Sequence, residues 1–271
     1  MKRVLLEICS GSLDDAIEAA VAGADRVELC SALFLGGLTP SMGALVEAKR
    51  RLTIPVMFML RPRPAGFCYS ASEFAAMERD AALAMAHGAD GLVFGVLTSN
   101  GRIDARRTRR LRALAGTCDA VFHRAFDVTP DPKRALDELV DLGITRVLAS
   151  GQAPTVAEGL EVIARLVEHA GDRIQVMPGG GIRPHEFATV IRASRCRQIH
   201  VAAWLAKRDS STRNRPAVTF GGALYPAEDL YDLTDRRVVE RLAQDIRGKT
   251  EYRIQKTEDR RRRAARHGRP A

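Results

Sequence analysis

One pattern recurs eight times in the first two hundred residues: a short apolar run that ends in polar, thiol or glycine residues and precedes a helix-like segment. Such alternation is typical of a (β/α)8 barrel of the TIM type, in which parallel strands form the inner wall and helices the outer ring. The chain has 271 residues, the length of one such barrel. We expect strands over residues 4–9, 25–30, 55–61, 90–95, 120–124, 146–150, 173–177 and 198–201.

Glycines support the repeat, because four joints between a helix and the next strand carry one: Gly23, Gly88, Gly143 and Gly171. Glycine adopts the left-handed conformation that ends a helix. We therefore predict one α/β domain over residues 1–246. In it the barrel is followed by a polar loop over residues 207–215 and an extra helix over residues 227–246.

The net charge of +9 is concentrated at the end of the chain. Residues 247–271 contain ten Lys or Arg and three acids, so seven of the nine net charges lie there. Basic segments can bind nucleic acid. This basic segment is not part of a separate folded domain. We therefore interpret residues 247–271 as a disordered basic tail and expect no nucleic-acid partner.

The composition points to a cytoplasmic protein. No apolar run approaches the roughly 18 residues of a membrane span, and a strand that starts at Val4 leaves no room for a signal peptide. The five cysteines have no CxxC spacing, which argues against a zinc module or a disulfide framework. We expect reduced thiols and no membrane partner.

Two neighbouring strands share a Glu-x-Cys ending, with Glu7 before Cys9 and Glu28 before Cys30. Side chains on a strand alternate, so each Glu lies on the same face as its Cys. Adjacent strands are about 4.8 Å apart, so the two thiols can meet if both face the barrel interior. Soft thiolates suit Cu(I). Simple packing of two small buried side chains is the alternative.

Carboxylates inside a barrel are costly unless they are paired. For Glu7 and Glu28 the candidate partners are Arg61, Arg63 and Arg124, which follow neighbouring strands. The group is either an ion-pair network that holds the barrel mouth or a set of acids and bases tuned by the cations.

His123 and Asp127 follow the fifth strand, and His200 lies at the end of the eighth. We predict that His123 moves a proton or is a metal ligand, with Asp127 orienting it. A hydrogen-bonded wall residue is the alternative interpretation of His123.

A glycine run, Gly179-Gly180-Gly181, follows the seventh strand. Barrels often hold phosphate on exposed backbone N–H groups at this position. Ser150 can contribute from the end of the sixth strand, and the three arginines add positive charge for an anionic ligand. A tight turn alone would also explain the glycines.

With these residues in place, the chain resembles the CutC copper-homeostasis family. The resemblance extends over roughly residues 4–200 and rests on several segments in order. They are Leu6-Glu-Ile-Cys9, Gly23-Ala-Asp-Arg-Val-Glu-Leu-Cys30, Gly36-Gly-Leu-Thr-Pro-Ser-Met-Gly43, Arg61-Pro-Arg63 with Tyr69-Ser70, Phe122-His-Arg-Ala-Phe-Asp127, Ser150-Gly151 and Met177-Pro-Gly-Gly-Gly-Ile182.

The resemblance implies a cytoplasmic TIM-type barrel that self-associates as a dimer or tetramer and has a link to copper. The family's proposed Cu(I) thiols match Cys9 and Cys30. A simple copper carrier would not need the Arg, His, Glu and glycine residues at the same mouth, so an enzyme acting on a small anionic or phosphorylated substrate stays open. In that hypothesis Glu7, Glu28, His123 and Asp127 supply acid–base groups, and the substrate is held by Arg61, Arg63, Arg124, Ser150, Gly179, Gly180, Gly181 and His200.

Overall fold

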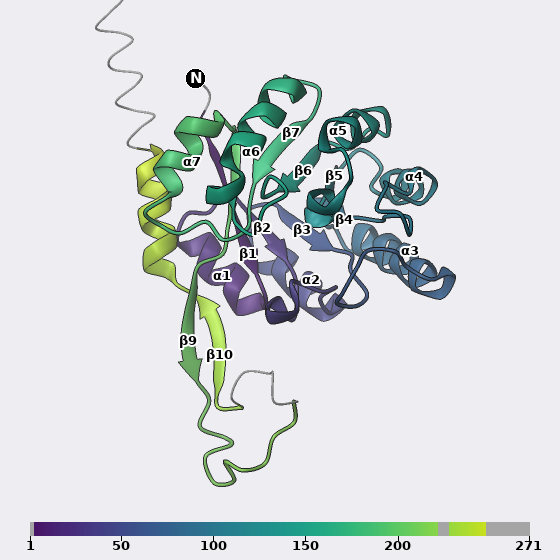
Figure 1. Ribbon diagram of the computed structural model, residues 1–271. Helices are drawn as coiled ribbons and strands as arrows, with labels where there is room; N and C mark the ends of the chain where they lie inside the picture. The colour runs from purple at the N-terminus through teal and green to yellow at the C-terminus, as the bar shows by residue number, and fades with distance from the viewer. Residues whose placement is uncertain (1–2, 222–227, 248–271) are drawn as a thin grey trace, which may run out of the picture.

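The computed structural model describes residues 3–221 and 228–247. Eight parallel strands form the inner wall of a TIM-type barrel, which confirms the fold predicted from the repeats (Figure 1). Their residues are mostly buried, as is usual in parallel sheets that helices cover. The strands are β1 (Leu5–Ser10), β2 (Arg26–Leu29), β3 (Val56–Met59), β4 (Gly91–Phe94), β5 (Asp119–Phe122), β6 (Arg146–Ala149), β7 (Gln175–Pro178) and β8 (Gln198–Val201).

Helices surround these strands and connect each to the next (Figure 1). Each of α1 to α6 begins after a Ser, Thr or Asp whose side chain accepts a hydrogen bond from a backbone N–H of the first turn. The helices are α1 (Leu13–Val21), α2 (Met42–Arg51), α3 (Ala71–Ala86), α4 (Ala105–Leu114), α5 (Pro132–Asp141), α6 (Val156–Ala170) and α7 (Phe187–Ser194), with 3-10 turns η1 (Leu33–Leu35) and η2 (Arg124–Val128).

The strands pair in the order β7-β6-β5-β4-β3-β2-β1-β8. The register places Cys9 opposite Glu28 on β2 and Glu7 opposite His200 on β8. Within the described residues no ladder joins β7 to β8, so the barrel is nearly closed. The strands nearest the candidate thiols, β8, β1, β2 and β3, form one continuous ladder that fixes their relative positions.

Strand alternation divides the apolar residues into two groups. On β3, Val56 and Phe58 belong to the large core between strands and helices, whereas Met57 and Met59 belong to a separate cluster. That cluster also contains Cys30, Val93 and Val121, and Cys9 and Leu33 pack against it. The small cluster lies on the strand face opposite the main core, which is the barrel interior.

After β8 the chain forms a two-stranded arm that the sequence did not predict. β9 (Trp204–Arg208) pairs antiparallel with β10 (Leu230–Thr234), and the hairpin projects beside α1 (Figure 1). The polar loop expected over residues 207–215 therefore begins inside a strand.

The extra helix expected over residues 227–246 is wrong in its first part, because residues 230–234 form β10. The helix covers residues 236–247. Its residues Val239, Leu242 and Ala243 are buried, and Ala243 lies near Gly23, which follows α1. Arg236 donates to Glu18 on α1 at 2.6 Å, and the Thr234 N–H just before the helix donates to Asp15 at 2.5 Å.

No helix in residues 3–221 or 228–247 is long and apolar enough to span a membrane. The basic tail, apart from Arg247, lies outside the described residues.

Candidate functional site

The Glu-x-Cys endings of β1 and β2 meet in the barrel interior. Cys9 Sγ lies 3.8 Å from Glu28 Oε2, and Cys30 Sγ lies 3.4 Å from the same oxygen. One ligand atom from each of Cys9, Glu28 and Cys30 lies within 4.8 Å of the others. Cys30 and Glu28 are buried, and Cys9 is half-buried. These three side chains form what we call the thiol site.

The two thiols have different acidities. The pKa of Cys9 is lowered to about 5, first by a hydrogen bond from Cys30 and also by an interaction with His200. Burial opposes this shift. The same hydrogen bond, burial and the charge of Glu28 raise the pKa of Cys30 well above its usual value. The pair therefore holds one thiolate, Cys9, and one thiol at neutral pH.

Three charged groups next to the thiol site, Glu7, Arg26 and His200, form what we call the charged layer. Glu7 accepts hydrogen bonds from Arg26 and from His200 Nδ1, the latter at 2.7 Å. His200 Nε2 lies 3.8 Å from Glu28. Burial raises the pKa of Glu28 to about 8, against the effect of the His200 charge. Burial alone would lower the pKa of His200. The interactions of His200 with Glu28, Cys9 and Glu7 are stronger and raise this pKa well above its usual value.

The expected partners of Glu7 and Glu28 were therefore wrong. Arg61 instead donates to the backbone carbonyls of Leu35 at 2.8 Å, Gly37 at 3.1 Å and Ala65 at 3.0 Å, and so holds two loops together. Its guanidinium also lies over the ring of Phe67.

Arg63 is likewise engaged outside the barrel interior. It forms an ion pair with Glu73 at 2.5 Å and donates to loop carbonyls. Glu73 belongs to the first turn of α3, so this pair joins the β3–α3 loop to its helix.

Arg124, Asp127 and Ser150 form a connected group beyond β5 and β6. Arg124 donates to Asp127 at 3.0 Å and to Ser150 Oγ at 2.7 Å. Asp127 also accepts from the backbone N–H groups of Ser150, at 2.9 Å, and Gln152, at 3.1 Å. The carboxylate thus orients the loop after β6.

His123 does not pair with Asp127, contrary to expectation. Its Nδ1 accepts a hydrogen bond from the Ala125 N–H at 3.1 Å, so the proton of the neutral ring lies on Nε2. Nε2 is buried and has no hydrogen-bond partner among the described residues. Burial, together with the charge of Arg61, lowers the pKa of His123 to about 3. At neutral pH His123 is a hydrogen-bond donor rather than a proton carrier.

The glycine turn after β7 lies between the side chains of His200 and Arg124. A Cβ on Gly179 would come 3.0 Å from the Cβ of His200, and one on Gly180 would come 2.8 Å from Cζ of Arg124. Gly180 and Gly181 have φ values of +118° and +67°, which favour glycine. The turn therefore brings backbone close to both the charged layer and Arg124.

The interpretation of the sequence missed Arg26, Met57 and Met59 as interior residues. Arg26 donates to Glu7 and to Gln198 at 2.8 Å. Strand alternation already contained the signal, since Arg26 lies two residues before Glu28 and the two methionines occupy alternate positions on β3.

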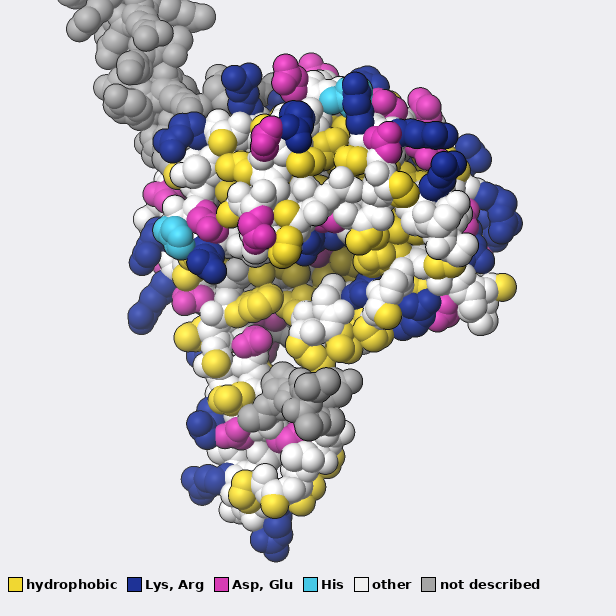
Figure 2. All heavy atoms as spheres, in the orientation of Figure 1, with side chains coloured by type: hydrophobic (Ala, Val, Ile, Leu, Met, Phe, Trp, Pro, Cys, Tyr) yellow, Lys and Arg dark blue, Asp and Glu magenta, His cyan; other side chains and the backbone are white. Residues whose placement is uncertain are grey.

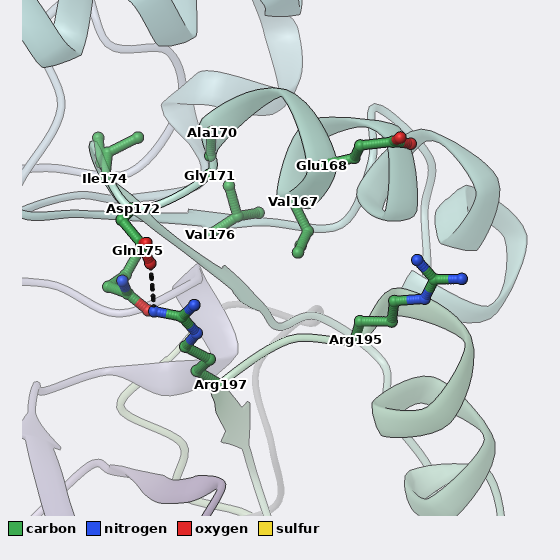
Figure 3. A pocket seen from close by; sticks show the side chains of 10 residues that line it. All are labelled: Val167, Glu168, Ala170, Gly171, Asp172, Ile174, Gln175, Val176, Arg195 and Arg197. Atoms are coloured by element: carbon green, nitrogen blue, oxygen red, sulfur yellow. Dashed lines mark ion pairs between the residues drawn. The ribbon is translucent and has the colours of Figure 1, made fainter. Parts of the chain in front are cut away.

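A cavity of about 230 Å³ lies at the opposite end of the barrel, next to the start of β7 (Figure 3). Arg195 and Arg197 flank it, and Arg197 forms an ion pair with Asp172 at 2.5 Å. Since TIM barrels place their chemistry where the strands end, this cavity is not the candidate site.

Comparisons with known proteins give a consistent result. Residues 4–204 match the model of the CutC family. A CutC family protein of Treponema denticola is 52% identical over 229 residues, which cover 84% of this chain and 93% of that protein. The human copper homeostasis protein cutC homolog is 43% identical over 246 residues, which cover 89% and 90% of the two chains.

Solved structures agree with both family and fold. The crystal structure of the CutC protein of Streptococcus agalactiae matches with a TM-score of 0.70 and 38% identity, over 73% of this chain and 97% of that one. Phosphoribosylanthranilate isomerase of Pyrococcus furiosus matches with a TM-score of 0.53 and 14% identity, over 90% and 99% of the chains. The second likeness concerns the TIM-barrel fold alone.

Proposed function

This chain belongs to the CutC family and is a homologue of copper homeostasis proteins, and from that premise we propose that it binds Cu(I) between the thiols of Cys9 and Cys30. The observation that carries the proposal is the spacing of the two sulfur atoms, which lie within 4.8 Å of each other. Metal–sulfur bonds of about 2.3 Å, the length found for zinc thiolates, would let one ion bridge them.

The surroundings of the pair favour a soft ion. Cys9 is a thiolate at neutral pH because its pKa is about 5, and the thiolate is the form that binds metal. Met57 and Met59 belong to the same apolar cluster as Cys30, so thioether sulfur atoms accompany the thiols in this part of the interior. Thiolate and thioether ligands select Cu(I) over hard cations. Because Cys9 is half-buried and Cys30 is buried, the ion would meet Cys9 first.

A Cu(I) titration under reducing conditions, against a chromophoric chelator, tests this proposal. We expect the tightest equivalent of Cu(I) to be lost in both Cys9→Ser and Cys30→Ser. Cys118→Ser is the matched control, since Cys118 is also half-buried but lies outside the cluster. If the Cys9→Ser/Cys30→Ser double variant binds Cu(I) as tightly as the original chain, the thiol site is wrong.

One observation favours a second function, an enzyme acting on a small anionic or phosphorylated substrate. Within the described residues, the N–H groups of Gly180 and Gly181 donate to no protein acceptor. The Arg124 side chain beside them is 41% exposed. Free N–H groups and a guanidinium at the end of β7 are what a phosphate group requires.

In this second proposal the charged layer would do the chemistry. An anion on Gly180 would lie next to Gly179, which contacts His200. Because the pKa of His200 is raised well above its usual value, His200 is a protonated acid at neutral pH. His123 stays neutral and can only donate a hydrogen bond.

Inorganic phosphate, titrated by calorimetry, tests this second site. Binding should weaken at least tenfold in Arg124→Gln, whereas Arg63→Gln, which alters a cation engaged with Glu73 outside the barrel, should bind as the original chain does. Equal phosphate binding by the original chain and Arg124→Gln would exclude the site.

A further inference from the structure

Arg61 is a buried cation with no carboxylate beside it. The residue is 7% exposed, and within residues 3–221 and 228–247 its guanidinium donates only to the backbone carbonyls of the two loops that it joins. On the face seen in Figure 2, the exposed Lys and Arg side chains lie among Asp and Glu side chains. A buried charge is costly unless an opposite charge compensates for it. Arg61 therefore favours an anion close to it.

The N–H donors next to this charge have no acceptor in the part of the chain that the structure describes. Nε of Arg61 and Nε2 of His123 are both buried without a hydrogen-bond partner, and Nε2 carries the imidazole proton because Nδ1 accepts from the Ala125 N–H. The hydroxyl of Tyr69, near Arg61, is a third such group, and burial raises its pKa to about 12, so it keeps its proton. A buried donor without an acceptor is destabilising, and an anionic oxygen is the strongest acceptor for it.

Arg61 and His123 face the same part of the barrel mouth. Strand alternation places Arg61 on the face of Met59 and His123 on the face of Val121, and both of these faces line the interior. Gly95, at the end of β4, lies between them in the strand order. A Cβ on Gly95 would come 2.5 Å from Cε1 and Nδ1 of His123. The missing side chain thus leaves room for the imidazole over the end of β4, on the side of β3 and Arg61.

The ring of Phe67 joins the two groups. Its centroid lies 5.0 Å from the centroid of the His123 ring and 5.4 Å from Cζ of Arg61. Phe67 is half-buried, and residues 64–66 and 68 beside it are exposed. The pair therefore lies beneath a surface loop, at the end of the barrel where the strands finish.

We propose that Arg61 and His123 form a carboxylate subsite at the barrel mouth. The charge of Arg61 attracts the anion, and Nε of Arg61 and Nε2 of His123 donate to its oxygen atoms. The hydrogen bonds from Arg61 to the two loops hold its guanidinium in place before the ligand arrives. His123 is a neutral donor throughout the physiological range, because burial and the charge of Arg61 lower its pKa to about 3.

The subsite rests on the second proposed function and narrows its substrate. His123 and Arg124 are consecutive residues at the end of β5, so the carboxylate subsite and the phosphate site beside Arg124 belong to one mouth. A substrate that uses both carries two acidic groups. Its class is a small phosphorylated carboxylic acid.

Formate, the smallest carboxylate, tests the subsite on the full chain, with the line width of [13C]formate in NMR as the measure of binding at pH 7. We expect saturable binding that is at least tenfold weaker in His123→Asn, because a hydrogen bond to a charged group is lost. Asn can still accept from the Ala125 N–H, so the turn after β5 keeps its hydrogen bond. His87→Asn is the matched control, since His87 is exposed at the end of α3.

Formamide resembles formate in shape but has no charge, so the original chain should bind it at least tenfold more weakly. Equal binding of the two compounds, no saturable binding of formate, or unchanged formate binding in His123→Asn would each overturn the proposal.

Inorganic phosphate separates the two sites. Formate should stay bound when phosphate is added, and displacement of formate by phosphate would mean a single anion site and reject the subsite. Formate binding by a chain that binds no phosphate would reject the phosphate site of the second proposed function and support the carboxylate subsite.

Discussion

Replacing Glu7 by Gln should destabilise the barrel strongly. Glu7 is 1% exposed and accepts hydrogen bonds from both Arg26 and His200. Gln keeps the volume but removes the charge, and the loss of one partner from a buried ion pair costs about 3–5 kcal/mol. Arg26 keeps its hydrogen bond to Gln198, so we expect the lower end, about 3 kcal/mol. At about 2–4 °C per kcal/mol, Tm should fall by about 6–12 °C.

Urea unfolding followed by circular dichroism measures this free energy. Glu161→Gln is the control, since its pair with Arg165 is highly exposed and should leave stability nearly unchanged. The double variant Glu7→Leu/Arg26→Met should lose less than the sum of the single variants Glu7→Leu and Arg26→Met, because it leaves neither of these two charges buried without its partner. A loss below about 1 kcal/mol for Glu7→Gln would refute the assignment of Glu7 as the anion that balances Arg26.

Two further predictions concern stability. Gly151→Ala should lower the free energy of unfolding in urea by more than about 2 kcal/mol, since its φ is +78° and a Cβ would lie 2.3 Å from the Gly159 carbonyl oxygen. Gly116→Ala is the control, because Gly116 has a φ of +57° but open space around it, so this variant measures the backbone strain alone. Equal losses in the two variants would rule out a steric clash at Gly151. The free energy of unfolding should also decrease as the pH is lowered from about 6.5 to about 3. In this range His123 of the unfolded chain takes up a proton, whereas buried His123 of the folded chain, with its pKa lowered to about 3, does not. His123→Asn should flatten that slope by up to about 1.4 kcal/mol per pH unit, and an unchanged slope would contradict the lowered pKa.

The barrel could be predicted because every repeat carries the same local information. Each apolar run is long enough for a buried strand, and glycines such as Gly23 and Gly143 adopt the positive φ expected of helix ends. Strand alternation also placed each Cys on the same face as its Glu, and left open whether that face was the interior. The structure places both thiols in the interior, close to each other.

The partners of the charged residues could not be predicted, because they depend on the direction in which each long side chain points at the end of its strand. Arg61 and Arg63 follow β3 closely, yet both turn to loop carbonyls and, for Arg63, to Glu73. Arg26 lies within the strand predicted over residues 25–30, but it was not considered as the partner of Glu7, which it faces directly. The β9–β10 arm was missed because all of β9 and most of β10 are exposed and neither strand carries a regular alternation of apolar and polar residues.

The charged layer also helps to decide which metal the interior would accept. Among residues 3–221 and 228–247, two sets of donors lie close enough to hold an ion: Cys9 with Glu28 and Cys30, and Glu7 with Glu28 and His200. In the second set Glu7 and His200 already neutralise each other, and Arg26 adds a further cation that would repel a metal. A hard cation would have to break those pairs, whereas a soft ion at the sulfur atoms would leave them intact. We infer that the ion pairs of the charged layer favour Cu(I) at the thiol site by making the carboxylate set unsuitable for competing hard cations.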